Sequence, residues 1–481
     1  MHIDLATVTP DLYDRTTCLT IDKKRRFPVD LISACFRVDK YSLFCYSCAG
    51  RGTEGSELNI NRRMSDQEAI MGEKLAIVIG GGPAPGINGV ISAVTFESVK
   101  QGLEVIGIFD GFKWLSKGDA SHIRNLLPEE ISRIHTRGGS MIRTSRDNPT
   151  KDPAKMANVI KTLNELGIKY LVTIGGDDTA FTSTQVEKAA GGKIAVCHVP
   201  KTIDNDLPLP HGVPTFGFET ARQLGGQLVE NLMEDAKTAF RWYFVVAMGR
   251  SAGHLALGMG MSAGATLTLI PEELGNKISL NKVVAILTGA VIKRMATGRN
   301  YGVAVIAEGV AIRFDPEELT IMKDVPRDEH GNIRLAEVPL GDLLKQRVTA
   351  ELDALGIKTT IIAKDIGYEL RCQPPISFDR EYTRYLGYSA VKFLVAGGTG
   401  AMIMLEDGVC HPIKFADLLD PKTGKTRIRV VDISADDYHM ARRYMLRLEK
   451  EDMEGENLNK LAATAKMTPA DFKKKFGVAV E

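Results

Sequence analysis

From Lys74 onward, short continuous apolar runs alternate with segments of helical spacing, and this alternation constrains the fold more than any other feature of the chain. The apolar runs cover residues 75–79, 103–109, 171–174, 194–199, 242–247, 266–270, 303–307 and 401–405. Residues 87–100 are typical of the helical segments. Continuous apolar strands separated by helices indicate parallel sheets covered on both faces, so we predict an α/β protein of the doubly wound class.

Length and charge limit the function classes that need to be considered. The chain has 481 residues, enough for two ordinary domains, and its 61 basic residues offset 60 acidic ones. This balance gives no overall attraction to nucleic acid or to an anionic membrane. No apolar stretch is long enough to span a bilayer, and Asp4, Asp11, Asp14 and Asp22 interrupt any secretory signal. We therefore expect a soluble, cytoplasmic protein without nucleic-acid or membrane partners.

Residues 1–70 show no sustained period and are predicted to be a poorly organised extension. Four of the seven cysteines lie there, but only Cys45 and Cys48 have the C-x-x-C spacing of metal and redox sites. A second closely spaced pair is missing, which favours free thiols over a zinc or redox role. Cys197, Cys372 and Cys410 have apolar neighbours and are expected to pack in the core.

The segment GGGPAPG, residues 80–86, follows the first apolar run and precedes a helical one. Glycines at the start of a helix let backbone N–H groups approach an anion, and the helix dipole favours negative charge. The segment is therefore a candidate phosphate cradle. The alternative is a sharp structural corner, because the segment matches neither the P-loop nor a dinucleotide fingerprint.

Two further segments concentrate charge after apolar runs. GGDDT, residues 175–179, places Asp177 and Asp178 where hard cations such as Mg²⁺ could bind, or where they could simply cap a helix. KTIDND, residues 201–206, brings a cation, a hydroxyl and carboxylates together. Asp204 could accept a proton from an attacking hydroxyl, and Lys201 could neutralise charge on a phosphoryl group. An Asx-type turn is the structural alternative for this second segment.

Arginines stand at both ends of the run 242–247. Arg250 ends the segment MGR directly after it, and Arg241 precedes it. The planar fork of arginine suits bidentate binding of phosphate oxygens. If the strand is straight, the two cannot share one ligand, so one of them serves a neighbouring subunit's site or pairs with a surface acid.

These segments, in this order, resemble the phosphofructokinase family over about residues 73–445. The motifs that carry the resemblance are GGGPAPGIN, DGF at 110–112, GGSMIRTSR, GGDDT, PKTIDND, MGRSAGH, IAEG at 306–309 and GYELR at 367–371. The resemblance implies two doubly wound three-layer α/β/α domains with the active site in the cleft between them. The expected phosphoryl-donor domain is 71–215 plus 370–430, and the expected sugar-phosphate domain is 216–369 plus 431–481.

The resemblance also assigns roles to individual residues. It implies that Asp204 accepts the proton of the sugar's 1-hydroxyl, that Asp177 organises Mg²⁺, and that Gly81 lies against the donor. Arg241 is expected to reach a second subunit, so the chain should form a homodimer or a homotetramer. The remaining implied contacts to the sugar phosphate come from Thr202, Ile203, Met248, Gly249, Arg250, Glu308, Tyr368, Glu369, Leu370 and Arg371. Of these, Tyr368 and Arg371 are implied to bind its 6-phosphate.

The identity of the phosphoryl donor depends on Asp178 and Lys201, which stand where the family's ATP-using branch usually has glycine. They match the pyrophosphate branch, as does Pro83. A carboxylate in the space of a nucleotide α-phosphate adds repulsion, because two like charges ~4 Å apart cost about 4 kcal/mol at an effective dielectric near 20. That is roughly a thousandfold in affinity. Lys201 meanwhile offers its ammonium to pyrophosphate.

The expected reaction is therefore reversible phosphoryl transfer from pyrophosphate to the 1-hydroxyl of fructose 6-phosphate, a step of glycolysis and gluconeogenesis. The 1-hydroxyl attacks in line, Asp204 takes the proton, and Lys201 with Arg146 shares the developing charge. An ATP-dependent phosphofructokinase and a catalytically inactive, phosphate-sensing relative are the alternatives.

Overall fold

The computed structural model describes residues 35–39, 42–46, 72–315, 318 and 339–480. The chain divides into two compact units, Met1–Ser65 and Asp66–Glu481. In the first unit, β1 (Cys35–Asp39) and β2 (Ser42–Tyr46) form an antiparallel pair, which the sequence did not predict. Most of the expected N-terminal extension, including Cys18 and Cys48, lies outside the described residues.

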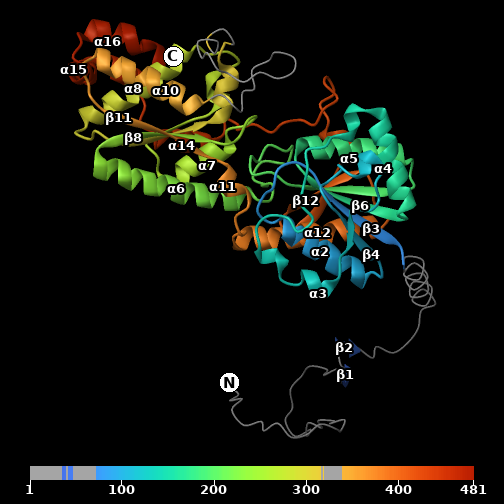
Figure 1. The fold of residues 1–481 in the computed structure, drawn as a ribbon. Helices are drawn as coiled ribbons and strands as arrows, with labels where there is room; N and C mark the ends of the chain where they lie inside the picture. Colours follow the sequence, from blue (N-terminus) through green and yellow to red (C-terminus); the bar gives the residue numbers. More distant parts are fainter. Residues whose placement is uncertain (1–34, 40–41, 47–71, 316–317, 319–338, 481) are drawn as a thin grey trace, which may run out of the picture. The chain divides into compact units, whose positions relative to one another are not determined.

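A seven-stranded sheet in the order β13-β12-β7-β6-β3-β4-β5 forms the centre of one part of the second unit (Figure 1). The five inner strands run parallel, and β5 and β13 pair antiparallel at the two edges. The strands are β3 (Lys74–Ile79), β4 (Glu104–Ile108), β5 (Ile123–Asn125), β6 (Ile168–Gly175), β7 (Ala195–Pro200), β12 (Ala401–Glu406) and β13 (Val409–Lys414).

Helices cover both faces of this sheet because its inner strands are apolar on both sides. Leu75, Ile77 and Ile79 of β3 pack in one core with α2 (Ile87–Lys100) and α12 (Ser377–Val395). The alternate residues Ala76 and Val78 pack in a second core with α4 (Pro153–Glu165) and α5 (Asp177–Ala190). The period of two along a strand thus produces the three layers.

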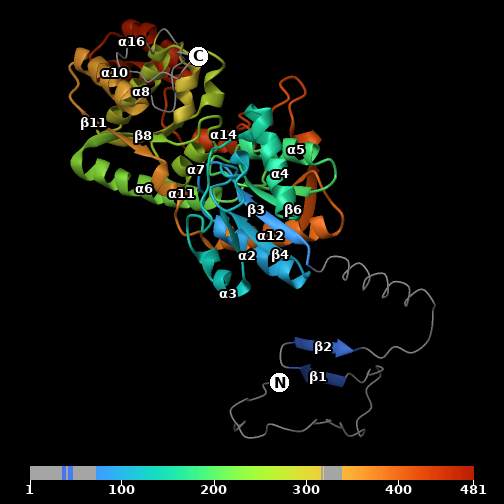
Figure 2. The same ribbon diagram turned by 45° about the vertical axis from the view of Figure 1, so that its right-hand side comes forward.

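The second sheet of this unit has four parallel strands in the order β11-β8-β10-β9 (Figure 2). Its strands are β8 (Arg241–Ala247), β9 (Leu267–Leu269), β10 (Gly302–Ala307) and β11 (Thr360–Ile366). One face packs on α6 (Phe218–Ala239) and α7 (His254–Ala263). The opposite face packs on α8 (Leu280–Ala296), α10 (Leu340–Ala354), α15 (Gly455–Thr464) and α16 (Pro469–Phe476).

Short elements complete the unit and carry several loops of the candidate site. They are α3 (Pro128–Ile131), η4 (Pro271–Leu274), η5 (Glu308–Arg313), α11 (Tyr368–Arg371), α13 (Phe415–Leu418) and α14 (Asp436–Arg443). Within the described parts of the chain, no helix is both long enough and apolar enough to cross a membrane.

The predicted doubly wound α/β class is confirmed, and all eight apolar runs are strands. The expectation for Cys372 was wrong: Cys197 is buried, but Cys372 is exposed at the end of α11. An apolar neighbourhood in sequence does not bury a side chain that follows a short surface helix.

Candidate active site

Three loops meet at the carboxyl ends of the neighbouring strands β3, β6 and β7. The Gly80 N–H donates to the Ile174 carbonyl over 2.9 Å, and the Lys201 N–H donates to the Gly175 carbonyl over 2.8 Å. The chain leaves β3 toward β4 on one side, while β6 lies on the other side. The loops after β3 and β6 therefore flank the point where the strand order reverses, which is where open α/β sheets bind ligands.

The glycine-rich loop after β3 is shaped by close packing against Thr179. A Cβ added at Gly80 would lie 2.3 Å from Thr179 Oγ1, and one added at Gly175 would lie 2.2 Å from Thr179 Cβ. The N–H of Gly81 donates to the Ser145 carbonyl over 2.8 Å, so the N–H groups of Gly80 and Gly81 are both used inside the protein. What the two residues offer a ligand is therefore close backbone approach rather than their own N–H groups.

Two cations converge on this loop. Lys201 Nζ donates to the Gly82 carbonyl over 2.5 Å, and it would lie 3.3 Å from a Cβ at Gly81. The Arg371 guanidinium carbon, which comes from α11 after the second sheet, would lie 3.4 Å from a Cβ at Gly82. Burial, together with the positive charge of Arg371, lowers the pKa of Lys201 to about 8. The glycine-rich loop thus lies against two cationic side chains, an arrangement that suits an anion.

Carboxylates lie beside these cations. Asp204 is partly buried, and its Oδ1, which is shielded from solvent, has no hydrogen-bond partner within the described chain. Burial raises the pKa of Asp204 to about 6, with the negative charge of Glu308 adding to the effect. Burial, together with the charge of Asp204, also raises the pKa of Asp206 to about 7. A partly buried carboxylate that has one oxygen without a hydrogen-bond partner and a pKa near neutrality is well suited to act as a general base.

Asp177 begins α5 and is the third carboxylate of the group. Its pKa is raised by burial and by the adjacent Asp178, and the positive charge of Arg250 opposes this rise. Asp178 itself is exposed in the first turn of the same helix. Arg146 is also exposed, and it follows Ser145, which forms an isolated parallel β-bridge with Gly80.

The loops after β8 and β10 supply the other side of the site. The Gly249 N–H donates to Glu308 Oε1 over 3.2 Å, and Gly249 has a φ of 136°, a conformation that favours glycine. Burial raises the pKa of Glu308, while the Gly249 N–H, Arg371 and Arg250 oppose the rise. Arg250 therefore influences Asp177 of the first sheet and Glu308 of the second.

The other predicted residues occupy varied environments. Ile203 and Leu370 are buried in a hydrophobic core, so only their main chains can face a substrate. Glu369 Oε2 accepts the Gly367 N–H over 2.9 Å, and Thr202 Oγ1 accepts the Asp204 N–H over 3.0 Å. The side chain of Met248 packs close to Gly367.

Tyr368 and Arg371 share one edge of the site. Tyr368 is 76% exposed, and the Arg371 guanidinium carbon lies 4.8 Å from the centre of its ring. Arg241 lies at the opposite end of β8 from Arg250, where its Nε is 3.6 Å from Asp235 Oδ2. This acid is a partner of the kind that the sequence left open for one of the two arginines.

The residues fit a magnesium ion that is held mainly by substrate. Among the described residues, no three His, Cys, Asp or Glu side chains cluster tightly enough to form a metal site. Mg²⁺ commonly uses only one or two carboxylates together with water and substrate phosphates. Asp177, at the start of α5 beside the glycine-rich loop, offers such a carboxylate.

Sequence reasoning missed two supporting residues. His198 is fully buried, its Nε2 lies 3.0 Å from the Gly175 carbonyl, and its Nδ1 lies 2.9 Å from Thr173 Oγ1. Burial lowers the pKa of His198 to about 3, so the ring is neutral and Nε2, which faces a carbonyl, carries the proton. His198 thereby fixes the same carbonyl that accepts the Lys201 N–H. Arg429 is the second residue, and its contacts are described below.

The fold and this arrangement of cations and carboxylates place the chain in a known family. The family model described as Phosphofructokinase matches residues 74–394, and the chain belongs to this family. It is 53% identical over 412 residues to the pyrophosphate--fructose 6-phosphate 1-phosphotransferase of Thermotoga maritima, covering 84% of this chain and 98% of that one. The Naegleria fowleri enzyme of the same name is 48% identical over 418 residues, covering 85% and 96%.

A likeness to a solved structure supports the fold. The crystal structure of a pyrophosphate-dependent phosphofructokinase from Marinobacter aquaeolei matches with a TM-score of 0.59 and 18% identity. The match covers 78% of this chain and 91% of that one. At this identity, the match shows that the fold is shared and carries no further conclusion.

Proposed function

We propose that the chain transfers a phosphoryl group reversibly between inorganic pyrophosphate and the 1-hydroxyl of fructose 6-phosphate. The products of the forward reaction are fructose 1,6-bisphosphate and phosphate. The main supporting observation is the position of Lys201, whose ammonium lies 2.5 Å from the Gly82 carbonyl inside the glycine-rich loop. The Thermotoga maritima and Naegleria fowleri relatives, which match over 98% and 96% of their own lengths, are named for this reaction, and their names support the proposal.

Asp204 acts as the general base in this proposal. Its side chain is partly buried, its Oδ1 has no hydrogen-bond partner within the described chain, and burial raises the pKa of the carboxyl to about 6. The group is then mostly ionised at neutral pH and still basic enough to accept the proton as the 1-hydroxyl attacks. The exposed Arg250 and the partly exposed Glu308 and Met248 are placed to orient the sugar.

Lys201, Arg146 and Arg371 stabilise negative charge on the phosphoryl groups. Lys201 and Arg371 lie against the glycine-rich loop from two different parts of the fold, so an anion held there contacts both. The family resemblance implies that Arg371 binds the 6-phosphate, and its position beside Gly82 adds the donor side to that role. Positioning and electrostatics supply most of the catalysis in phosphoryl transfer.

Mg²⁺, when bound, neutralises phosphate charge and helps to orient the donor. Asp177 is the protein carboxylate that we propose to hold it together with pyrophosphate oxygens. Asp178, which is exposed one residue later, keeps a negative charge at the mouth of the donor space and disfavours a nucleotide there.

The domain roles follow the two sheets. We propose that the seven-stranded sheet binds the donor and that the four-stranded sheet binds the sugar phosphate through Tyr368, Glu369 and Arg371 at the junction. Arg241 would act in a second subunit of a homo-oligomer, where a phosphate would replace Asp235 as its partner.

The proposal is tested by assaying the purified full chain with fructose 6-phosphate and Mg²⁺, once with pyrophosphate and once with ATP. We expect fructose 1,6-bisphosphate to form rapidly with pyrophosphate and negligibly with ATP. Turnover with ATP alone would support the ATP-dependent alternative. Binding of phosphate without turnover with either donor would support an inactive sensing relative, and either result would overturn the proposal.

A further inference from the structure

Residues 426–431, here called the strap, connect the two sheet regions near the candidate site. The strap begins at Thr426, which forms an isolated bridge with Leu419, and it ends before α14. It lies beyond residue 394, where the match to the family model ends.

The first end of the strap holds the start of α5. Thr426 is buried, and its Oγ1 donates to the Asp177 carbonyl over 3.0 Å. Three residues later, the Arg429 N–H donates to the Asp206 carbonyl over 2.8 Å. Two loops that carry carboxylates of the site are thus bonded to one short segment.

The guanidinium of Arg429 clamps the segment that follows Asp204. Its Nε donates to the Asn205 carbonyl over 3.1 Å, and its Nη2 donates to Asn205 Oδ1. Its Nη1 faces three carbonyls, at 3.2 Å for Leu209, 3.0 Å for Pro210 and 2.7 Å for Val213. One planar group therefore holds both ends of the loop 205–213.

Asn205 links this clamp directly to the general base. It has a φ of 56°, in the left-handed region that few residues other than glycine and asparagine adopt. Its Oδ1 also accepts the Thr215 N–H over 3.0 Å, so the side chain is fixed from two sides. Because Asn205 follows Asp204 in the chain, its backbone conformation sets the direction in which the Asp204 carboxyl points.

The other end of the strap reaches the sugar side of the site. Glu272 Oε1 accepts the Val431 N–H over 3.0 Å and the Gly253 N–H over 2.8 Å. Gly253 belongs to the segment MGRSAGH, residues 248–254, which also contains Met248 and Arg250. A single carboxylate oxygen therefore joins the strap to the loop that bears Arg250.

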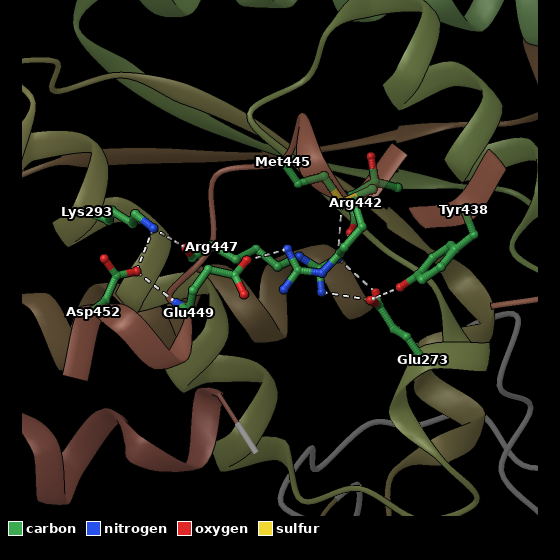
Figure 3. Close-up of polar contacts among 9 residues, drawn as sticks. Glu273, Lys293, Tyr438, Arg442, Met445, Arg447, Glu449 and Asp452 are labelled. Atoms are coloured by element: carbon green, nitrogen blue, oxygen red, sulfur yellow. Dashed lines mark hydrogen bonds and ion pairs between the residues drawn. The ribbon is translucent and has the colours of Figure 1, made fainter. Parts of the chain in front are cut away.

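The chain after the strap is anchored strongly beside Glu272. The buried Arg447 donates to both oxygens of the neighbouring Glu273, over 2.8 Å from Nη1 and 2.9 Å from Nη2, and the Tyr438 hydroxyl donates to Glu273 Oε2 over 2.7 Å (Figure 3). Lys293 and Asp452 continue the network, with Lys293 Nζ 2.5 Å from Asp452 Oδ2. This network gives the strap a fixed point in the second sheet region.

We propose that the strap sets the position of the Asp204 loop relative to the Arg250 loop, and that Arg429 is its positioning residue. The inference rests on the proposed function for its catalytic consequence. Arg429 does not touch the reacting atoms, and it acts by holding Asn205 and the loop behind the base. A misplacement of about 1 Å in such a group can cost on the order of 100-fold in rate.

The test compares Arg429→Ala, Arg429→Lys and Glu272→Ala with Arg427→Ala as the matched control. Arg427 lies on the same strap, but it is exposed and its side chain donates to the Asp417 carbonyl, away from the loop 205–213. We expect Arg429→Ala to lower kcat with pyrophosphate by about 100-fold, with a smaller change in KM for fructose 6-phosphate. Arg429→Lys should fall between Arg429→Ala and the parent, and Arg427→Ala should retain the parent's activity.

Two readouts separate positioning from a general structural effect. Guanidinium ion at millimolar concentration should restore part of the kcat of Arg429→Ala, because it can occupy the vacated position. Amide hydrogen exchange should become faster in residues 203–213 of Arg429→Ala and near Gly253 in Glu272→Ala, which removes the acceptor of the Gly253 N–H, while the cores of both sheets stay protected. If Arg429→Ala fails to fold, Arg429→Lys and Glu272→Ala give the same comparison.

The proposal is overturned if folded Arg429→Ala keeps kcat within about threefold of the parent, or if exchange in residues 203–213 is unchanged. Hydrogen exchange does not depend on the reaction. If the parent shows no turnover with pyrophosphate, the proposed function therefore fails, while the exchange measurement still decides whether the strap holds the loop.

Discussion

Replacing Asp204 by Asn should remove catalysis and yet stabilise the folded protein at neutral and alkaline pH. Burial, together with Glu308, raises the pKa of Asp204 from 3.8 to about 6. A carboxyl whose folded pKa is raised contributes stability below its unfolded pKa, and this stability is lost as the pH rises through the folded pKa. The shift of about two pKa units corresponds to about 3 kcal/mol of lost stability at pH 8.

The assay is urea unfolding of the parent and Asp204→Asn at pH 5 and pH 8. Roughly half of the loss has already occurred at pH 5, so the variant should gain about 1.5 kcal/mol more at pH 8 than at pH 5. Any pH-independent cost of placing an amide there cancels in this difference. Asp407→Asn, in the exposed turn between β12 and β13, is the control and should show no such difference.

Turnover of Asp204→Asn should fall by about 100-fold to 10,000-fold, because the variant lacks the base. Equal stability changes at both pH values would refute the idea that the site holds this carboxylate at an energetic disadvantage. Retention of the parent's turnover would refute its role as the base.

Three further predictions concern other parts of the molecule. The kcat/KM for pyrophosphate should fall as the pH rises above about 8, because the Lys201 ammonium then loses its proton. Burial lowers the pKa of this ammonium to about 8. A flat profile of kcat/KM from pH 7 to 10 would contradict this prediction. Gly81→Ala should raise KM for pyrophosphate, since Gly81 has a φ of 81° and an added Cβ would lie 3.3 Å from Lys201 Nζ, whereas Gly298→Ala, at a φ of 77° with nothing within 4 Å, should leave it unchanged. Arg447→Met should lower the free energy of unfolding by about 3–5 kcal/mol, because it leaves the buried Glu273 carboxylate without its cationic partner (Figure 3). A loss below about 1 kcal/mol in urea unfolding would show that this ion pair does not anchor the chain after the strap.

The central strands could be predicted because they are buried on both faces and therefore read as continuous apolar runs. The strands β11 and β13 could not, because they lie at sheet edges and carry exposed polar residues such as Lys364 and His411. β5 has only three residues and left no periodic signal. Edge strands gain their stability from one neighbour, so their sequences are less constrained.

The loops of the candidate site were predictable for a related reason. Parallel strands bring their carboxyl ends to the same edge, so polar segments after β3, β6 and β7 had to meet. The side-chain partners across long separations were not predictable. Arg429 and Asn205 are 224 positions apart in the sequence. No local pattern distinguishes an arginine that donates to backbone carbonyls from one that binds a ligand.

The site also shows how one residue can belong to two regions. The motif containing Arg371 indicated the sugar's 6-phosphate, yet the structure brings the guanidinium against Gly82 of the donor loop. Only the arrangement of the two sheet regions determines this proximity. Spacing within the motif carries no information about it.

The central claim is that Asp178 and Lys201 select pyrophosphate over ATP. The most direct measurement is the ratio of kcat/KM for ATP to that for pyrophosphate, in the parent and in the double variant Asp178→Gly with Lys201→Gly. We expect a very low ratio in the parent and an increase of roughly a thousandfold in the double variant, as relief of like-charge repulsion requires. An unchanged ratio, or a parent that already prefers ATP, would contradict the account.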